Sequence, residues 1–380
     1  MNQNHLNYID RINLGSYYTN NNLVSIVGNM IEKFIDNKTI IFDSSCGYGN
    51  FFNNDFTNIQ IGNDLDPDAI NIAKQRFSNI KFYNENALEN INREKFGIKK
   101  NDKLCIIGNP PYNDTTSIIR AGIKRLSFEI DKDIKTRDLG MSFLLSYNKL
   151  KADYICVLHP LSYLIKKSNF NLLKNFTSNY KLIDNLLISS GVFENASKGI
   201  QFPILIGLYK RDNIGMDYNY ILNYDFKIDN KKSFKLNDFD YIDNYISKYP
   251  SKFNNKINEN SILFWTMRDI NALKRNRTFI NNFSYNAIII DKNKLDYYVY
   301  VDVFKYFSYI IPYYLGNLNV FINNNEFLKN KDLFIINAIS RNKFLQQYYN
   351  FNINKELLEV ANEKIKNYFI NLLKYHYVYR

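Results

Sequence analysis

The stretch TIIFDSSCGYGNF, residues 39–51, joins a short apolar strand to a glycine-rich turn. The strand ends on Asp43, and Gly47 and Gly49 follow in a turn that leads into a predicted helix. In an open α/β sheet, such a turn lets the backbone approach a nucleotide-like ligand at the carboxyl end of a strand. The turn alone also fits a purely structural role, because glycines are common in turns of every kind.

A second acid favours the ligand-binding interpretation. Asp64 ends the next predicted strand, in the text GNDLDP at residues 62–67. Rossmann-like sites place the carboxylate that binds ribose hydroxyls about 20 residues after the glycine turn. The pattern GxGxxG is absent, which disfavours a dinucleotide with a pyrophosphate. A nucleoside cofactor with a small cationic tail, such as S-adenosylmethionine, suits the two acids better, because Asp43 can attract its amine.

Helix-like and strand-like segments alternate through the first half of the chain. The predicted elements are a helix at 23–35, strands at 39–43 and 59–65, a helix at 66–77, strands at 80–85 and 103–109, a helix at 141–151, a strand at 153–160, a helix at 168–176, and strands at 180–190 and 201–211. This alternation predicts an α/β fold with a doubly wound parallel sheet, and the last two strands predict a terminal antiparallel hairpin. The asparagine triplets at 20–22 and 323–325 are predicted to be loops.

The alternation ends after Arg211, so the sequence predicts a domain boundary near residue 212. The first domain, 1–212, is the α/β domain, and the second, 213–380, mixes strands, basic clusters and a long helix at about 355–375. The formal net charge of the chain is +12. Residues 1–100 contribute none of this excess, because they carry 10 basic and 11 acidic residues. Residues 251–380 carry 18 basic and 10 acidic residues. A positive excess of this kind indicates a polyanionic partner, with nucleic acid the first candidate.

Several classes of protein are disfavoured by what the sequence contains. The three cysteines, Cys46, Cys105 and Cys156, lie far apart, and none of the three histidines is near one of them, so neither a disulfide framework nor a metal site is expected. No apolar run reaches the length of a membrane span, and the start of the chain has no apolar core of a signal peptide. We therefore expect a cytoplasmic protein without a membrane partner.

A second motif, CIIGNPPYND at residues 105–114, ends another apolar strand with Asn109, Pro110, Pro111 and Tyr112. Two consecutive prolines remove two backbone donors and fix φ near −65°, so the tetrapeptide predicts a stiff platform at the carboxyl end of a strand. It offers no acid, base, thiol or metal ligand. The alternative is a simple turn with a surface tyrosine.

Taken together, Asp43-x-x-Cys46-Gly47-x-Gly49-x-Phe51 and the later Asn-Pro-Pro-Tyr motif resemble those of the N6-adenine DNA methyltransferases. The order of the parts is similar to that of their gamma group, and the resemblance covers residues 14–211. It implies a Rossmann-like sheet that binds S-adenosylmethionine, followed by a C-terminal DNA-recognition domain. It also implies a cofactor site made of Tyr17, Thr19, Asp43, Cys46, Gly47, Gly49, Phe51, Asp64, Leu65, Asn86 and Asn109.

Within that resemblance, individual residues take individual roles. Tyr17 and Thr19 lie beside the methionine end of the cofactor, which Asp43 also binds, while Asp64 binds the ribose and Leu65 contacts the cofactor's adenine. At Asn86 the chain departs from the family, which usually has an acid there, although an amide can also hydrogen-bond to an adenine edge.

The catalytic roles that the resemblance implies follow from the chemistry of the adenine N6 amine, whose lone pair is delocalised into the adenine ring. Acceptors on the Asn109 side chain and the Pro110 carbonyl favour a localised lone pair directed at the methyl group, and rigid prolines hold these acceptors still. Tyr112 stacks on a target base that has left the duplex. In the text ISSGVFENASKGIQFPILI, the resemblance makes Phe193 a second aromatic contact to the base; the alternative is that Phe193 only anchors its loop.

The second domain contains a basic and aromatic segment, ILFWTMRDINALKRNRTF, at residues 262–279. Its basic residues suit phosphate contacts and base-edge recognition, although exposed lysines and arginines are often only solvated. The candidate DNA contacts are Arg268, Lys274, Arg275 and Arg277.

The sequence therefore predicts a site-specific DNA adenine N6-methyltransferase that acts on double-stranded DNA, alone or with a separately encoded restriction endonuclease. Three alternatives remain: an RNA adenine N6-methyltransferase, a protein glutamine N5-methyltransferase that grips a planar amide with the same motif, and a degenerate DNA-binding module. The basic second domain argues against the glutamine enzyme, and the intact motifs argue against the degenerate module.

Overall fold

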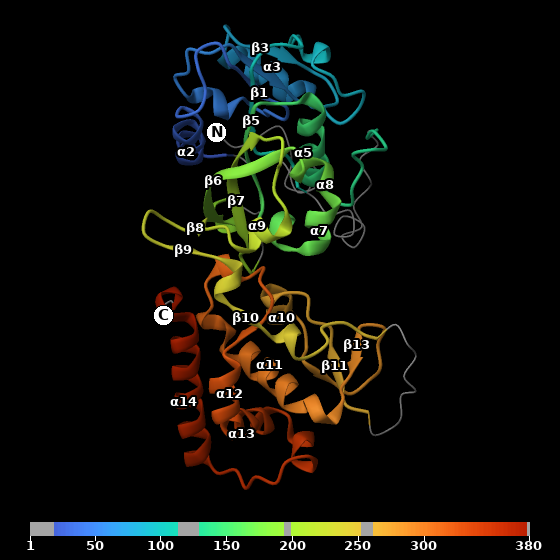
Figure 1. Ribbon diagram of the computed structural model, residues 1–380, viewed down its shortest axis with the longest axis vertical. Helices are drawn as coiled ribbons and strands as arrows, with labels where there is room; N and C mark the ends of the chain where they lie inside the picture. Colours follow the sequence, from blue (N-terminus) through green and yellow to red (C-terminus); the bar gives the residue numbers. More distant parts are fainter. Residues whose placement is uncertain (1–18, 113–128, 194–198, 252–260, 378–380) are drawn as a thin grey trace. The chain divides into compact units, whose positions relative to one another are not determined.

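The computed structural model describes residues 19–112, 129–193, 199–251 and 261–377, and the chain forms two compact units, Met1–Leu236 and Asn237–Arg380 (Figure 1). The first unit extends beyond the predicted boundary near 212 because the segment after Arg211 returns to the sheet. Asn185 donates to the Asp225 carbonyl at 2.9 Å and accepts from the Lys227 amide at 2.9 Å. In the described parts of the chain, no helix has both the length and the apolar character needed to cross a membrane.

A seven-stranded sheet organises the first unit, with the strand order β3-β2-β1-β4-β5-β7-β6. The strands are β1 (Ile40–Asp43), β2 (Gln60–Asn63), β3 (Lys81–Tyr83), β4 (Leu104–Gly108), β5 (Tyr154–Pro160), β6 (Tyr180–Ser189) and β7 (Pro203–Arg211). The first five strands of this order pair in parallel, and β7 is antiparallel to both β5 and β6. The predicted α/β fold with a parallel sheet and a terminal antiparallel hairpin is confirmed.

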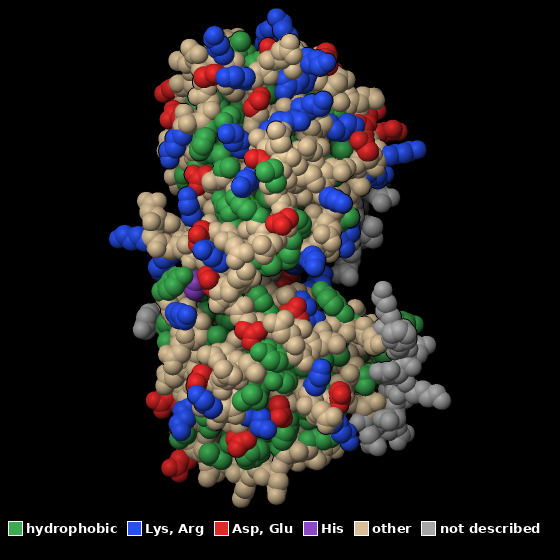
Figure 2. Space-filling view, in the orientation of Figure 1, with side chains coloured by type: hydrophobic (Ala, Val, Ile, Leu, Met, Phe, Trp, Pro, Cys, Tyr) green, Lys and Arg blue, Asp and Glu red, His purple; other side chains and the backbone are tan. Residues whose placement is uncertain are grey.

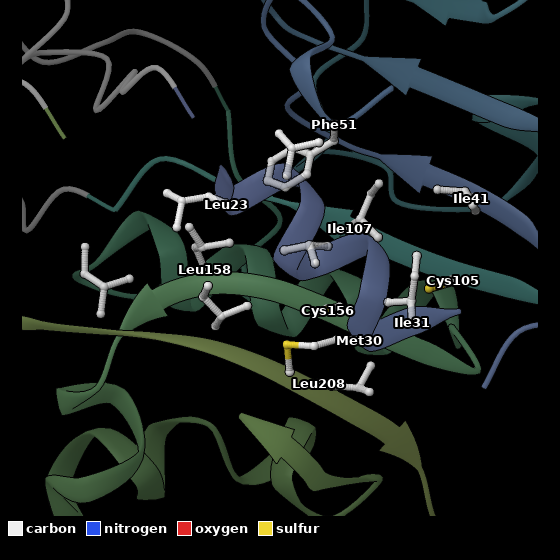
Figure 3. Close-up of a cluster of buried hydrophobic side chains, with 14 of the residues drawn as sticks. Leu23, Met30, Ile31, Ile41, Phe51, Cys105, Ile107, Cys156, Leu158 and Leu208 are labelled. Atoms are coloured by element: carbon white, nitrogen blue, oxygen red, sulfur yellow. The ribbon is translucent and has the colours of Figure 1, made fainter. Parts of the chain in front are cut away.

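Helix α2 (Asn21–Ile31) covers one face of this sheet and forms the core with it (Figure 3). Alternate residues of each strand contribute to the cluster, as the period of a strand requires: Cys105 and Ile107, Cys156 and Leu158, and Ile204, Ile206 and Leu208. Burial of each large aliphatic side chain stabilises the fold by roughly 1.5–3 kcal/mol. The carboxyl ends of β1 and β4 are thus held in place by a packed layer.

The remaining helices of the first unit follow individual strands. Helix α3 (Pro67–Arg76) begins as predicted, since Asp66 caps it by accepting from the Asp68 amide at 2.9 Å and Pro67 occupies the first position. Helix α5 (Leu139–Leu150) and α8 (Lys174–Thr177) lie on the side of the strands opposite α2 in Figure 1. Short helices α6 (Ser162–Ile165), α7 (Lys167–Leu172) and α9 (Tyr218–Leu222) and the strands β8 (Phe226–Lys227) and β9 (Ser233–Phe234) complete it.

Both asparagine triplets differ from the prediction of loops. Asn20 is the N-cap of α2 and accepts from the Leu23 amide at 3.0 Å, and Asn323 caps α12 (Asn324–Lys329) by accepting from the Glu326 amide at 3.2 Å. The next two asparagines of each triplet form the first helical turn. Asparagine is favoured both in loops and at N-caps, because its short side chain reaches backbone donors, so composition alone did not distinguish the two.

The second unit is mainly helical around an aromatic core. Its longer helices are α11 (Leu295–Phe307), α13 (Lys331–Arg341) and α14 (Lys355–Leu373), with α10 (Ile270–Arg275) beside three short strands, β11 (Leu263–Trp265), β12 (Phe279–Ile280) and β13 (Ala287–Ile289). Strand β10 (Asp240–Tyr241) pairs with β14 (Phe321–Ile322). Tyr300, Phe304, Phe334 and Phe369 pack with ring centroids 5.4 to 6.1 Å apart.

Candidate active site

The glycine turn after β1 has the backbone conformation that only glycine adopts easily. Gly47 and Gly49 have φ of 52° and 75°. A side chain at Gly49 would also meet the rings of Phe52 and Phe77 at 3.1 Å. The Cys46 amide donates to the Asn63 carbonyl at 2.8 Å, which fixes the turn against the end of β2.

Asp64, at the end of β2, meets this turn directly. Its Oδ2 accepts from the Gly47 amide at 2.8 Å, and its Oδ1 accepts from the Asp66 amide at 2.9 Å. Two sequence motifs that were expected to share a ligand therefore lie in hydrogen-bond contact. Each carboxylate oxygen can accept a further bond, so Asp64 can still receive hydroxyl donors.

Asp43 is a buried acid with an unused oxygen. It is 1% exposed, and its Oδ1 accepts from the Ser45 amide at 3.1 Å. Its Oδ2 and the nearby Ser45 hydroxyl have no hydrogen-bond partner among the described residues. Burial raises the pKa of Asp43 to about 8, and the negative charge of Asp64 adds to the rise. A cationic donor at Oδ2 would reverse this penalty.

Gly108 brings the end of β4 against this acid. Strands β1 and β4 are parallel neighbours, with Asp43 opposite Ile107. Gly108 has φ of 146°, and a Cβ on it would lie 2.8 Å from Asp43 Oδ1. Gly108 was not among the residues predicted from the sequence, although its place immediately before Asn109 was a signal that the backbone passes close to another group there.

Asn109 presents a buried carbonyl oxygen. Its Nδ2 donates to Thr19 Oγ1 at 3.3 Å, while its Oδ1 has no hydrogen-bond partner in the described part of the chain. The Thr19 carbonyl in turn accepts from Asn50 Nδ2 at 3.3 Å. Thr19 therefore orients the amide so that an acceptor is left available. Tyr17, predicted with Thr19 to lie beside the methionine end of the cofactor, is outside the described residues.

Helix α5 forms the wall behind the platform. Gly140 has no side chain where Tyr112 approaches: a Cβ there would lie 3.0 Å from Tyr112 Cβ and 2.6 Å from the Tyr163 hydroxyl. Asp138 caps α5 by accepting from the Gly140 amide at 3.1 Å, and it also accepts from the Tyr163 hydroxyl. Pro110 is buried, and Pro111 and Tyr112 are partly buried. Gly140 and Tyr163, which were not among the residues predicted from the sequence, therefore lie against Tyr112 and the start of α5.

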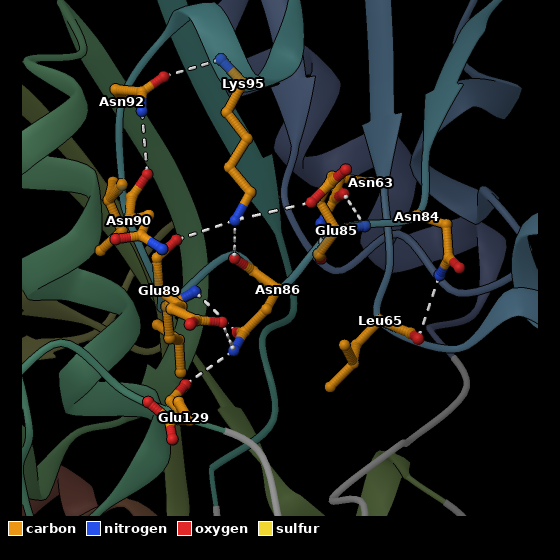
Figure 4. Close-up of polar contacts among 12 residues, drawn as sticks. Asn63, Leu65, Asn84, Glu85, Asn86, Glu89, Asn90, Asn92, Lys95 and Glu129 are labelled. Carbon is orange, nitrogen blue, oxygen red and sulfur yellow. Dashed lines mark hydrogen bonds and ion pairs between the residues drawn. The ribbon is translucent and has the colours of Figure 1, made fainter.

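The other predicted cofactor residues lie in different environments. Leu65 is 48% exposed beside Asp64, whereas Phe51 and Cys46 are buried in the protein. The Asn86 amide is occupied, because its Oδ1 accepts from the Leu88 amide at 3.0 Å and its Nδ2 donates to the Glu129 carbonyl at 2.7 Å (Figure 4). The Asn86 Oδ1 atom can accept one further hydrogen bond, so a ligand donor can reach it without breaking the bond from Leu88.

Phe193 is buried at 2% exposure in the core cluster formed with α2. The structure therefore places it away from solvent, as expected for a residue that anchors its loop. Among the described residues, no group of three or more His, Cys, Asp or Glu side chains could hold a metal ion.

Comparison with known proteins gives no family assignment: no family model and no curated protein matches the sequence. Solved structures match about half of the chain. They include a protein described as the modification subunit of a type I restriction enzyme from Vibrio vulnificus YJ016, with 17% identity, a TM-score of 0.38, and coverage of 53% of this chain and 46% of that one. The chain therefore spans less than half of the length of that subunit.

Two further matches are described as methyltransferases. One is described as a class I S-adenosylmethionine-dependent methyltransferase from Listeria monocytogenes, with 16% identity, a TM-score of 0.37, and coverage of 56% of this chain and 64% of that one. The other is described as an RNA methyltransferase from Pyrococcus horikoshii, with 15% identity, a TM-score of 0.36, and coverage of 52% and 88%. TM-scores this low do not assign a function, which has to come from the residues of this chain.

The candidate DNA contacts lie in the second unit, on and around α10. Arg268, Arg275 and Arg277 are exposed, while Lys274 is partly buried and donates to the Ile311 carbonyl at 3.3 Å. On the face drawn in Figure 2, Lys and Arg side chains are spread over both units with Asp and Glu among them. Net charge alone therefore does not mark a binding surface.

Proposed function

We propose that the chain is a site-specific DNA adenine N6-methyltransferase that uses S-adenosylmethionine. The observation that carries this proposal is a pair of buried acceptor oxygens at neighbouring strand ends, Asp43 Oδ2 and Asn109 Oδ1, which have no hydrogen-bond partner among the described residues. Buried polar atoms are nearly always hydrogen-bonded in folded proteins, so two such atoms together suggest that a ligand supplies their donors.

The residues around Asp43 fit S-adenosylmethionine. Asp43 would pair with its amino group, Asp64 would accept from its ribose hydroxyls, and exposed Leu65 would contact its adenine, beside the turn of Gly47 and Gly49. When bound, this cofactor supplies a methyl group made electrophilic by its sulfonium. Tyr17, Thr19, Cys46, Phe51 and Asn86 complete the proposed cofactor site.

The residues around Asn109 fit a planar amine. Asn109 Oδ1 and the Pro110 carbonyl would accept the two N6 hydrogens of adenine, so that the nitrogen lone pair points at the methyl group. Thr19 supports this role because it holds the amide nitrogen and leaves the oxygen for the substrate. The site would then act mainly by orientation and by fixed acceptors: S-adenosylhomocysteine would leave, and the methylated nitrogen, acidic once alkylated, would lose one proton to water without a strong base.

Tyr112 would stack on the target base, which must leave the duplex to reach Asn109. Extrusion of a base costs a few kcal/mol, and stacking on an aromatic ring returns roughly 1–3 kcal/mol per base. Phe193 is the proposed second aromatic contact, and its burial means that it touches the base only if its side chain moves out of the core.

Double-stranded DNA is the proposed substrate because the larger, C-terminal part of the second unit is basic and follows the β6–β7 hairpin in the sequence. Residues 251–380 carry 18 basic and 10 acidic residues. A glutamine side-chain methyltransferase would not need a basic unit of this size. We further propose a cytoplasmic enzyme that acts alone or beside a separately encoded restriction endonuclease.

The test is to incubate the protein with methyl-labelled S-adenosylmethionine and, separately, duplex DNA, RNA and bacterial protein, and then to locate the label by digestion and chromatography. We expect label on adenine N6 of duplex DNA. Label on RNA or on a protein glutamine, or none on N6 across varied DNA, would overturn the proposal.

A matched pair of variants links that activity to the site. Asn109→Ala should abolish transfer and leave the affinity for S-adenosylhomocysteine within a few-fold of the wild type. Asn293→Ala, at an exposed position in the second unit, should change neither. Normal turnover of the Asn109→Ala variant would remove Asn109 from the mechanism.

A further inference from the structure

We propose that the second unit binds the DNA backbone through a surface that is assembled around the buried carboxylate of Asp302. We define this Asp302 surface by the exposed or half-exposed side chains of Arg275, Arg277, Tyr306, Tyr309, Lys343 and Phe344. The choice of DNA as the nucleic acid depends on the proposed function, whereas the location of the surface depends only on the contacts below.

Asp302 connects three separate segments of the chain. It lies on α11 and is 6% exposed. Its Oδ1 accepts from the Thr278 hydroxyl at 2.5 Å, and its Oδ2 accepts from Arg341 Nη2 at 2.7 Å and from Asn342 Nδ2 at 3.1 Å. One buried carboxylate therefore fixes the segment after α10 and the end of α13 against the same helix.

Two further contacts bring the same segments together. Lys305 of α11 donates through Nζ to the Asn276 carbonyl, between the two exposed arginines of the α10 segment. The rings of Phe279 and Phe344 pack edge to face with centroids 5.3 Å apart. The turn that carries Arg277 and the turn that carries Lys343 are thus held against each other by polar and apolar contacts.

The half-exposed ring of Tyr306 packs on the guanidinium of Arg341. The Arg341 Cζ atom lies 4.5 Å from the centre of the ring, and Tyr306 is 51% exposed. Arg341 is itself held by Asp302 and by Asn337 Oδ1, at 2.5 Å from its Nη1. Because the guanidinium is fixed in the fold, its role is to support the tyrosine, and other cations must contact phosphate.

The charged residues of the segments around Asp302 are all basic. Segments 272–286, 303–325 and 333–354 contain six basic residues and no acidic residue. Arg275, Arg277 and Lys343 are exposed, and their side chains make no hydrogen bond or ion pair with any residue that the structure describes. The acid that joins the segments, Asp302, is buried and paired with Arg341, so it does not offset them at the surface.

This combination favours nucleic acid over other polyanionic or apolar partners. Free arginines and a lysine suit phosphate oxygens, and half-exposed rings such as Tyr306 and Tyr309 suit sugars and bases. Each phosphate that a cation neutralises releases counterions, which makes the binding steeply dependent on salt. The surface thus predicts affinity that falls with ionic strength and with loss of these cations.

The experiment measures binding of the full chain to a fluorescein-labelled duplex of mixed sequence by anisotropy, without cofactor, over a series of salt concentrations. The double variant Arg277→Ala/Lys343→Ala should weaken binding by roughly tenfold or more and reduce the salt slope by about 2. The control, Lys364→Ala/Lys366→Ala, removes the same charge from exposed positions on α14 and should change both quantities little. Melting curves verify that both variants fold.

Equal losses in the two double variants would overturn the proposal, because they would show a diffuse charge effect. If the double variant Arg277→Ala/Lys343→Ala loses affinity for labelled RNA but not for duplex DNA, the proposal would also be overturned, because the surface would then bind RNA. Tyr306→Leu should weaken duplex binding several-fold without changing the salt slope. Binding that depends on Arg277 and Lys343 but without any methyl transfer would count against the proposed function alone.

Discussion

Replacement of Asp43 by asparagine tests the electrostatics of the candidate cofactor site. The pKa of Asp43 is about 8 in the folded protein, against 3.8 for an ordinary aspartate, mainly because burial disfavours its charged form. The raised pKa stabilises the fold fully below about pH 4, and this contribution is lost as the pH rises through about 8. Asparagine stays neutral, so the variant should lack this loss.

The size of the stability change follows from the pH interval between the unfolded-state and folded-state pKa values of Asp43. Each pH unit between the two pKa values changes the free energy of unfolding by at most about 1.4 kcal/mol, or about 4 kcal/mol between pH 5 and pH 8. Relaxation and water entry reduce such buried-charge effects, so we expect about 2 kcal/mol. In urea denaturation, the free energy of unfolding of Asp43→Asn, relative to that of the wild type, should therefore increase by about 2 kcal/mol between pH 5 and pH 8.

The same substitution should weaken ligand binding. A hydrogen bond to a charged group contributes about 1.5–3 kcal/mol, so the Kd for S-adenosylhomocysteine should rise roughly 10-fold to 100-fold. In wild type at pH 7, Asp43 must lose its proton to pair with the amine, and calorimetry in buffers of different ionisation enthalpy should detect that release. Asp55→Asn, at an exposed position, is the control. Parallel pH profiles and equal affinities for Asp43→Asn and wild type would refute this reasoning.

Three other substitutions test the neighbouring groups. Gly108→Ala would place a Cβ 2.8 Å from Asp43 Oδ1 at a φ of 146°. We therefore expect a loss of stability of about 1–3 kcal/mol in thermal melts and weaker binding of S-adenosylhomocysteine. Unchanged stability and affinity would contradict the close approach of Gly108 to Asp43. Gly140→Ala should slow methyl transfer and leave that affinity within about twofold, because its Cβ would lie 3.0 Å from Tyr112 Cβ; an unchanged rate would separate α5 from the platform. Asn109→Asp should slow transfer at pH 7 and regain part of it by pH 9, since a buried carboxyl stays protonated to higher pH and its protonated form presents a donor beside its acceptor. Transfer at the wild-type rate across this pH range would contradict the need for a fixed acceptor.

The fold could be predicted from the sequence because its signals are local. Asp66 and Pro67 mark the start of α3, and apolar runs that end at Asp43 and Gly108 mark buried strands. The errors arose where one residue type serves two purposes. Asn20 and Asn323 were expected in loops, and they cap helices through the same side-chain geometry that makes asparagine common in loops.

The candidate site was predicted only as a set of residues, because contacts between distant segments are not written in either motif. The sequence indicated Asp64 and the glycine turn, but the bond from the Gly47 amide to Asp64 required the pairing of β1 with β2. Gly140 lies in another helix, and its importance depends on the missing Cβ opposite Tyr112. The burial of Phe193 is likewise a property of the core, since a phenylalanine after a strand can face either way.

The two buried acceptors differ in the one property that suits each to its proposed ligand. Asp43 can change its charge near neutral pH, so a cationic amine can select the anionic form and gain an ion pair as it binds. Asn109 cannot change its charge, whereas an acid at the neighbouring strand end would change its charge and its hydrogen-bonding groups with pH. An amide there remains an acceptor at every working pH. This arrangement suits a reaction whose electrophile is already activated, because the protein then has only to hold a neutral amine in line with it.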